Sequence, residues 1–220
     1  MLELISFLFL ALVLGFKHSY DADHLIAVSN ILRKVKSIRS SMKIGFVWAI
    51  GHMMAATIIT ILLYFFRESI LRYILPHFEK IVGLMLIILG IISLKDFFSF
   101  HSHKHKHGAL VHSHLHLHKK TQNNKHAHKH MFGIGIIHGL ASNDELLALF
   151  TASLAVTSLG GLLIGLGFFS IGVVLGMIFF AMFFSYPLIK LHSEKIYRII
   201  SFGTGALGVI YGMFMIFGAV

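Results

Sequence analysis

Six apolar segments, each close to the length that crosses a lipid bilayer, constrain this chain more than any other feature. They lie at residues 2–32, 44–66, 80–98, 131–156, 162–188 and 199–219. A spanning helix needs about 20 mostly apolar residues. The composition agrees, because 56% of the 220 residues are hydrophobic, 13% are charged and the mean hydropathy is +0.82. The sequence therefore predicts an all-α integral membrane protein with six transmembrane helices.

Lysine and arginine residues gather in alternate connections between these segments. Connections 33–43, 95–130 and 190–198 contain five, seven and three of them, whereas the amphipathic segment 67–80 contains three and the turn 157–161 none. Cytoplasmic loops of membrane proteins have the excess of Lys and Arg. We therefore expect a multi-pass protein of the plasma membrane with both termini outside and residues 101–130 in the cytoplasm. The formal charge of +10 is then a sign of topology and not of nucleic-acid binding.

The two halves of the chain resemble each other at an offset of about 120 residues. Gly15-Phe-Lys-His18 matches Gly135-Ile-Ile-His138, and each is followed by a polar cluster. Glycines alone would indicate only close helix packing. Together with the polar clusters, they predict two inverted three-helix repeats, 1–100 and 131–220, separated by the linker 101–130, with helices 1 and 4 broken near the midplane. Such repeats with broken polar helices are typical of transporters.

The first polar cluster follows an apolar run directly and contains His18, Asp21, Asp23 and His24. Ionisable residues at membrane depth are costly and usually mark an ion path. Because each residue of a helix turns by about 100°, His18, Asp21 and His24 would share one side of a straight helix and Asp23 would not. If Asp23 binds the same ion as the two histidines, this segment must be bent.

Two further segments supply candidate ligands. His52 follows Gly51 in the second apolar segment, where a lone histidine is as well explained by packing as by ligation. The fourth segment supplies His138, Asn143, Asp144 and Glu145. Ser142 with Glu145 also fits a helix capping box, and both interpretations can hold together.

The linker is rich in histidine, with eleven of the seventeen histidines of the chain between residues 101 and 130. Such tracts bind metals and are disordered without them, so we expect a disordered linker that holds divalent ions loosely. The chain has no cysteine. Imidazole and carboxylate ligands without thiolates suit divalent Ni, Co, Zn, Mn or Fe, and we expect no prosthetic group.

These motifs resemble the nickel/cobalt transporter family. His18-Ser-Tyr-Asp-Ala-Asp23-His24 matches the H-x4-D-H signature of that family, and Gly51-His52 is similar to its second motif. Gly135-Ile-Ile-His138-Gly-Leu-Ala141 is most similar to the short six-helix, urease-accessory-like branch. The resemblance implies passage of Ni(II) or Co(II) through the membrane, with His18, Asp23, His24 and His52 as ligands.

We therefore predict membrane transport of a divalent metal ion, with Ni(II) first and Co(II) second, through a His/Asp site at the midplane. The alternatives are a membrane accessory protein that delivers nickel to a partner, or a zinc transporter. We expect no enzyme, because the H-E-x-x-H motif of metalloproteases is absent. Besides the metal ion and the bilayer, a cytoplasmic metallochaperone or a second copy of the chain is a candidate partner.

Overall fold

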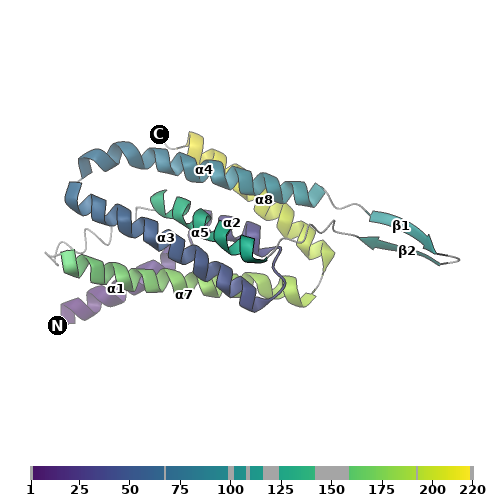
Figure 1. Ribbon diagram of the computed structural model, residues 1–220, viewed down its shortest axis with the longest axis horizontal. Helices are drawn as coiled ribbons and strands as arrows, with labels where there is room; N and C mark the ends of the chain where they lie inside the picture. Colours follow the sequence, from purple (N-terminus) through teal and green to yellow (C-terminus); the bar gives the residue numbers. More distant parts are fainter. Residues whose placement is uncertain are drawn as a thin grey trace.

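The structure is a computed structural model that describes residues 2–66, 68–98, 102–107, 110–115, 124–141, 159–191 and 193–218. These residues form a helical bundle and one β-hairpin that projects from its end (Figure 1). The helices are α1 (Leu2–His18), α2 (Ala22–Leu32), α3 (Ile38–Phe66), α4 (Glu68–Phe98), α5 (Asn124–Ala141), α7 (Leu159–Leu191) and α8 (Glu194–Phe217). The strands β1 (Ser102–His107) and β2 (Leu110–Leu115) pair antiparallel, with His105 opposite His112.

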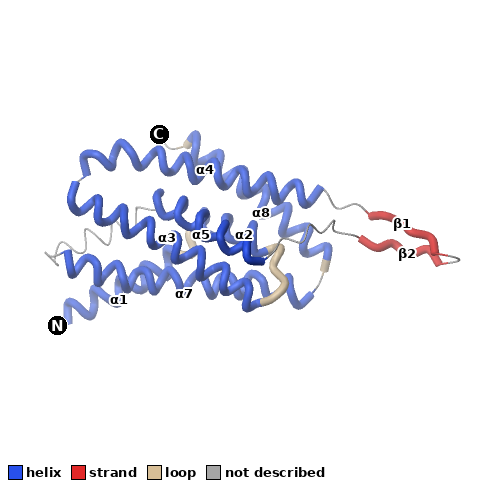
Figure 2. Tube along the Cα trace, in the orientation of Figure 1, coloured by secondary structure: helices blue, strands red, loops and turns tan. Residues whose placement is uncertain are grey.

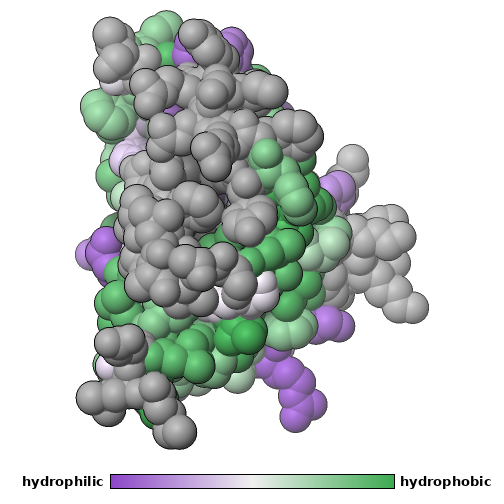
Figure 3. All heavy atoms as spheres, turned by 90° about the vertical axis from the view of Figure 1, so that its left-hand side faces the viewer, coloured by the Kyte–Doolittle hydropathy of each residue, from purple (hydrophilic) through white to green (hydrophobic). Residues whose placement is uncertain are grey.

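Several helices are long and apolar enough to cross a membrane. In the described residues, four helical segments meet this condition, and the bent pair α1 and α2 makes a fifth span if it is counted as one. The segment His130–Ala141 is apolar but shorter. Many large apolar side chains lie on the outside of the bundle, among them Phe9, Ile58, Phe183 and Ile210. One end of the molecule shows broad hydrophobic areas (Figure 3). Since an exposed apolar surface of this extent marks contact with another apolar phase, the protein is a multi-pass membrane protein.

The helices pack in a defined order. α4 lies along α8, α1 lies along α7, and α3 lies between α5 and α7. The short helix α2 is set among α4, α7 and α8 (Figure 2). Both termini lie towards the end of the bundle opposite the hairpin (Figure 1).

Glycine permits such close approaches, as two positions illustrate. A Cβ atom at Gly15 in α1 would overlap the carbonyl oxygen of Phe169 in α7. A Cβ atom at Gly135 in α5 would overlap the carbonyl oxygen of Trp48 in α3. Small residues let helix backbones come together in this way in membrane proteins. The contact between α5 and α3 brings His138 towards His52.

The expected bend in the first apolar segment is present. α1 ends at His18, α2 begins at Ala22, and the two helices are bent by 55° at the break. The polar residues that follow the run Ile5–Phe16 therefore stand at a helix end and a helix start, not along one straight helix.

Three expectations differ from the structure. Residues 68–80 are part of α4 and not a separate amphipathic segment, because apolar residues such as Ile70 and Ile74 continue the helical spacing into it. The linker, expected to be disordered, contains the β-hairpin and the start of α5 among its described residues; the backbone groups of β1 and β2 find their partners in each other. The connection expected at 190–198 is shorter, because the Ser193 hydroxyl accepts a hydrogen bond from the Ile196 N–H (3.4 Å) and caps α8.

The second expected break lies only partly within the described residues. The interruption is expected at His138–Glu145; its first residues, 138–141, end α5, and residues 142–158, with the rest of helix 4 and the start of the turn 157–161, lie outside the described residues. Residues 159–161 of that turn belong to α7. The structure therefore describes a helical membrane protein with one broken span.

Candidate metal centre

The break between α1 and α2 leaves polar backbone groups that the chain satisfies locally. The N–H groups of Tyr20 and Asp21 donate to the carbonyl oxygens of Lys17 (2.9 Å) and His18 (3.1 Å). The His18 carbonyl oxygen also lies 2.9 Å from Nδ1 of His24. Backbone groups released by a break at membrane depth need such partners. The break thus fixes the ring of His24 in place.

Four buried histidines from four helices meet at this break. They are His18 of α1, His24 of α2, His52 of α3 and His138 of α5, and each is at most 1% exposed. The ring centroids of His24 lie 4.6 Å from those of His18, 4.8 Å from His52 and 5.4 Å from His138. One ring nitrogen from each of His18, His24 and His52 lies within 4.8 Å of the other two. This spacing allows all three to reach one metal ion.

The hydrogen bonds of His18 and His24 determine which ring nitrogens can act as ligands. Nδ1 of His24 faces a carbonyl oxygen, and Nδ1 of His18 lies 2.9 Å from Oδ2 of Asp21. Both partners only accept, so we assign the proton to Nδ1 in each ring. Nε2 then carries the lone pair, and a partner on the other nitrogen is the usual way in which proteins orient a histidine ligand.

Nε2 of His18 lies 3.3 Å from Nε2 of His52. The lone pair of His18 therefore points to the next member of the cluster.

Asp21 thus stands apart from the cluster centre. Its carboxylate contacts the outer nitrogen of His18, and its side chain is 34% exposed. The sequence placed Asp21 among the candidate ligands because a spacing of three residues suggested a shared helix face. The break changes the direction of the chain between His18 and His24, and Asp21 at the start of α2 orients His18 instead.

Asp23 lies between two histidines. Its Oδ2 is 3.7 Å from Nε2 of His24 and 3.7 Å from Nε2 of His138. Within the described part of the chain, no hydrogen-bond partner is present for Nε2 of His24, Nδ1 of His52 or either ring nitrogen of His138. Buried polar atoms are normally paired. A carboxylate oxygen among unpartnered imidazole nitrogens is the donor set that a divalent first-row metal ion prefers.

Trp48 forms one wall of the cluster. Its ring is stacked on that of His52, with centroids 5.0 Å apart and an interplanar angle of 17°, and it meets His24 and His138 edge-on at 5.0 and 5.6 Å. Trp48 is fully buried. Trp48 is not among the residues predicted from the sequence to form the site, although its spacing of four residues from His52 places both on one helix face.

Six of the nine candidate ligands lie in described residues. The structure brings His18, His24, His52, His138 and Asp23 together, and it places Asp21 behind His18. Asn143, Asp144 and Glu145 lie outside the described residues, as does Ser142.

Residues 25–213 match the family described as "Cytochrome C biogenesis protein transmembrane region". The chain is 32% identical over 212 residues to the urease accessory protein UreH of Bacillus sp. (strain TB-90), which covers 96% of this chain and 90% of that protein. It is 31% identical over 96 residues to the nickel transporter NixA of Staphylococcus aureus (strain NCTC 8325 / PS 47), which covers 39% of this chain and 28% of that protein. No solved structure matches.

The family match and the spanning helices define the class: this is a polytopic membrane protein of the family with that transmembrane region. The name of the family does not by itself assign an activity to this chain. The chain has no cysteine and therefore no thiol for disulfide exchange or for attachment of a c-type haem. Within that class, the chain belongs to the nickel/cobalt-transporter-related proteins that include UreH and NixA, as its H-x4-D-H motif predicted. These relatives are named as an accessory protein and a transporter, in agreement with the expectation that the chain is not an enzyme.

Proposed function

We propose that this protein moves Ni(II) across the membrane through the histidine cluster at the break of α1 and α2. The observation that carries the proposal is the convergence of four buried histidines and Asp23, several with unpartnered nitrogens. Polar groups of this kind are costly inside a membrane and occur there mainly along ion paths. The ligands in this proposal are His18, Asp23, His24, His52 and His138, with Asn143, Asp144 and Glu145 as further candidates.

The relatives favour nickel over other ions. One is named a nickel transporter and the other an accessory protein of urease. The donor set of imidazoles and carboxylates without sulfur suits Ni(II) and also Co(II), so cobalt is the second candidate. Zinc is the third, since the same ligands bind it.

A position near the bilayer midplane is supported by the place of His52 in α3. This helix has 29 residues, Ile38–Phe66, and His52 is its central residue. At 1.5 Å per residue, His52 lies about 21 Å from either end of the helix. The ion would then reach the site from either side of the membrane by a similar distance.

An inverted repeat is supported by two equivalent contacts. Gly15 meets Phe169, and Gly135 meets Trp48; the two glycines differ by 120 positions and the two aromatic residues by 121. The same contact thus joins the first helix of each half to the second helix of the other half. We infer that residues 1–100 and 131–220 are inverted repeats of three spans each, with the helix predicted at 131–156 as the second broken helix.

The proposed orientation follows from charge. The connections rich in Lys and Arg would be cytoplasmic and the termini outside, and the position of both termini towards one end of the bundle (Figure 1) is compatible with an even number of spans. A membrane potential of 100 mV contributes about 4.6 kcal/mol for entry of a divalent cation, from about 2.3 kcal/mol per charge. This favours uptake.

A second candidate is an accessory role, in which the protein binds nickel and delivers it to a partner. The name of UreH and the histidine-rich linker favour it. The partner would be a cytoplasmic metallochaperone, or a second copy of the chain would complete the assembly.

Nickel accumulation in cells tests the proposal. We expect His24→Ala and Asp23→Asn to lower nickel accumulation to the level of cells without the protein. His130→Ala, at an exposed position of α5, is the matched control and should accumulate nickel normally. Unchanged accumulation in both site variants would refute the proposed function. Replacement of residues 102–115 by a Gly/Ser linker separates the candidates, since a transporter should retain accumulation and an accessory protein should lose its function.

A further inference from the structure

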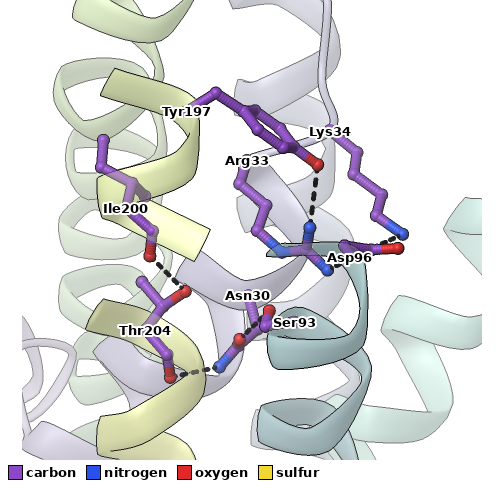
Figure 4. Close-up of polar contacts among 8 residues, drawn as sticks. All are labelled: Asn30, Arg33, Lys34, Ser93, Asp96, Tyr197, Ile200 and Thr204. Atoms are coloured by element: carbon purple, nitrogen blue, oxygen red, sulfur yellow. Dashed lines mark hydrogen bonds and ion pairs between the residues drawn. The ribbon is translucent and has the colours of Figure 1, made fainter. Parts of the chain in front are cut away.

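A second polar cluster lies at the other end of α2 and ties this helix to α4 and α8 (Figure 4). Nη2 of Arg33 lies 2.5 Å from Oδ2 of Asp96 in α4, and Nζ of Lys34 lies 2.6 Å from the same oxygen. Nη1 of Arg33 donates to the hydroxyl of Tyr197 in α8 (2.9 Å). Three charged groups and one tyrosine thus join the end of α2 to two neighbouring helices.

One turn earlier, Asn30 makes a second set of contacts to the same two helices. Its Oδ1 accepts a hydrogen bond from the hydroxyl of Ser93 in α4. Its Nδ2 lies 3.2 Å from the carbonyl oxygen of Thr204 in α8 and 2.8 Å from that of Ile26 in α2 itself. Asn30 therefore uses both ends of its amide to hold α2 between α4 and α8.

Stability alone explains this cluster poorly. Arg33 and Asn30 are each 3% exposed, and burial of such groups has a desolvation cost that their contacts often only offset. Apolar side chains of similar size would hold two helices together as well. Directional polar contacts differ from apolar contacts in one respect: they are lost when the two groups move apart by a small distance.

Water can take over these contacts when they break. The side chains of Lys34 and Asp96 are 40% and 32% exposed, so the outer side of the cluster is open. A displacement of α2 would leave these charges solvated, which lowers the free-energy cost of separating them.

α2 is also short, and the helical structure is interrupted on both sides of it. It has 11 residues, Ala22–Leu32, with the break at Ser19–Asp21 before it and the connection at 33–37 after it. Its first turn carries Asp23 and His24, and its last carries Asn30. A movement of α2 at its far end would therefore move two of the proposed metal ligands.

We propose that the contacts of Asn30 and Arg33 with α4 and α8 form a releasable clamp on α2, and that metal enters and leaves the histidine cluster when this clamp opens. The inference rests on the proposed function of that cluster. It assigns to Arg33 and Asp96 a positioning role in transport, away from the metal ligands.

A reversible cross-link tests the clamp. The chain has no cysteine, so Asn30→Cys with Ser93→Cys gives a protein with two thiols only, at positions whose native side chains touch. Oxidation or a short bis-thiol reagent should lock α2 to α4. We expect nickel association and dissociation of the purified protein each to slow by about tenfold or more, with the equilibrium Kd unchanged within about twofold and full recovery in reductant, since a locked barrier acts equally on both directions.

The outcomes separate the clamp from the proposed function. If the locked protein exchanges nickel as fast as the reduced protein, or binds it with a much weaker Kd, the clamp is refuted and transport through the cluster still stands. If the wild-type protein binds and moves no nickel, the proposed function fails and the clamp fails with it. The single variants Asn30→Cys and Ser93→Cys, treated with the same oxidant, control for oxidation itself.

A second pair of variants covers the case in which the double-cysteine protein does not fold. Arg33→Gln removes the ion pair of Arg33 with Asp96 and leaves that of Lys34, whereas Asp96→Asn removes both ion pairs; each variant retains a polar side chain. We expect both nickel rates to rise by about tenfold with little change in Kd, and the exchanged pair Arg33→Asp with Asp96→Arg to return the rates towards wild type. Rates equal to wild type in both single variants would overturn the proposal.

Discussion

Replacement of Asp21 by alanine should weaken nickel binding without removing a ligand. In the structure the Asp21 carboxylate accepts from Nδ1 of His18 at 2.9 Å and is 34% exposed. A hydrogen bond to a charged group contributes about 1.5–3 kcal/mol when buried, and partial exposure places this one near the lower end. A loss of about 1.4 kcal/mol corresponds to about tenfold in Kd, within the range of about 10–100-fold for partners that orient metal-bound histidines.

The assay has two measurements on the purified protein. A titration with Ni(II) gives Kd, and the visible absorption spectrum is recorded for the Co(II) complex. The spectrum reports the number and geometry of the ligands. We expect Asp21→Ala to raise Kd about tenfold with the Co(II) spectrum unchanged, and Asp21→Asn, whose amide oxygen can still accept from His18, to lie between it and wild type.

Two results would refute the reasoning. A Kd within about twofold of wild type would mean that the hydrogen bond does not hold His18 in a binding orientation. A changed Co(II) spectrum would make Asp21 a ligand, as the spacing of the sequence first suggested.

Three further predictions test the surroundings of the cluster. Gly139→Ala places a Cβ against the carbonyl oxygen of His52, whereas Gly133 has nothing within 4 Å of such an atom; we expect Gly139→Ala to weaken nickel binding and Gly133→Ala, its control on the same helix, to leave it unchanged. Trp48→Ala should lower the free energy of unfolding by about 3 kcal/mol because of the cavity it creates. Thermal unfolding in detergent measures this change, and equal melting temperatures of Trp48→Ala and Trp48→Phe would contradict the role of the indole as a wall of the cluster. His138→Ala should weaken nickel binding more than His130→Ala, measured by the same titration, and equal Kd values would exclude His138 from the site.

Local patterns in the sequence predicted the break in the first apolar segment and the family of the protein. The apolar run that ends at Phe16 and the polar residues from His18 to His24 predicted a bent helix, and the structure has a break at that place. The family assignment from the H-x4-D-H motif is confirmed by a relative, UreH, that matches 96% of the chain.

What the sequence could not provide depends on contacts between distant segments. Spacing on an ideal helix put Asp21 with His18 and His24, but the direction of the chain changes at the break and Asp21 lies behind His18. Trp48 carries no ionisable group, so only its neighbours in space indicate its place at the cluster. The contact of Arg33 with Asp96 joins positions 63 residues apart, and no local pattern around either residue predicts it.

The hydrogen bond from Nδ1 of His24 to the His18 carbonyl oxygen has a consequence for the speed of the site. In metal-dependent domains the ion orders the chain, and its binding free energy becomes folding free energy. Here a backbone oxygen already holds the ring in place, so in the proposed site little conformational entropy of His24 would be lost when an ion binds. Its departure also leaves the helix break intact. If the proposed function is correct, such a site would bind and release ions repeatedly without unfolding, as transport requires and long-term storage does not.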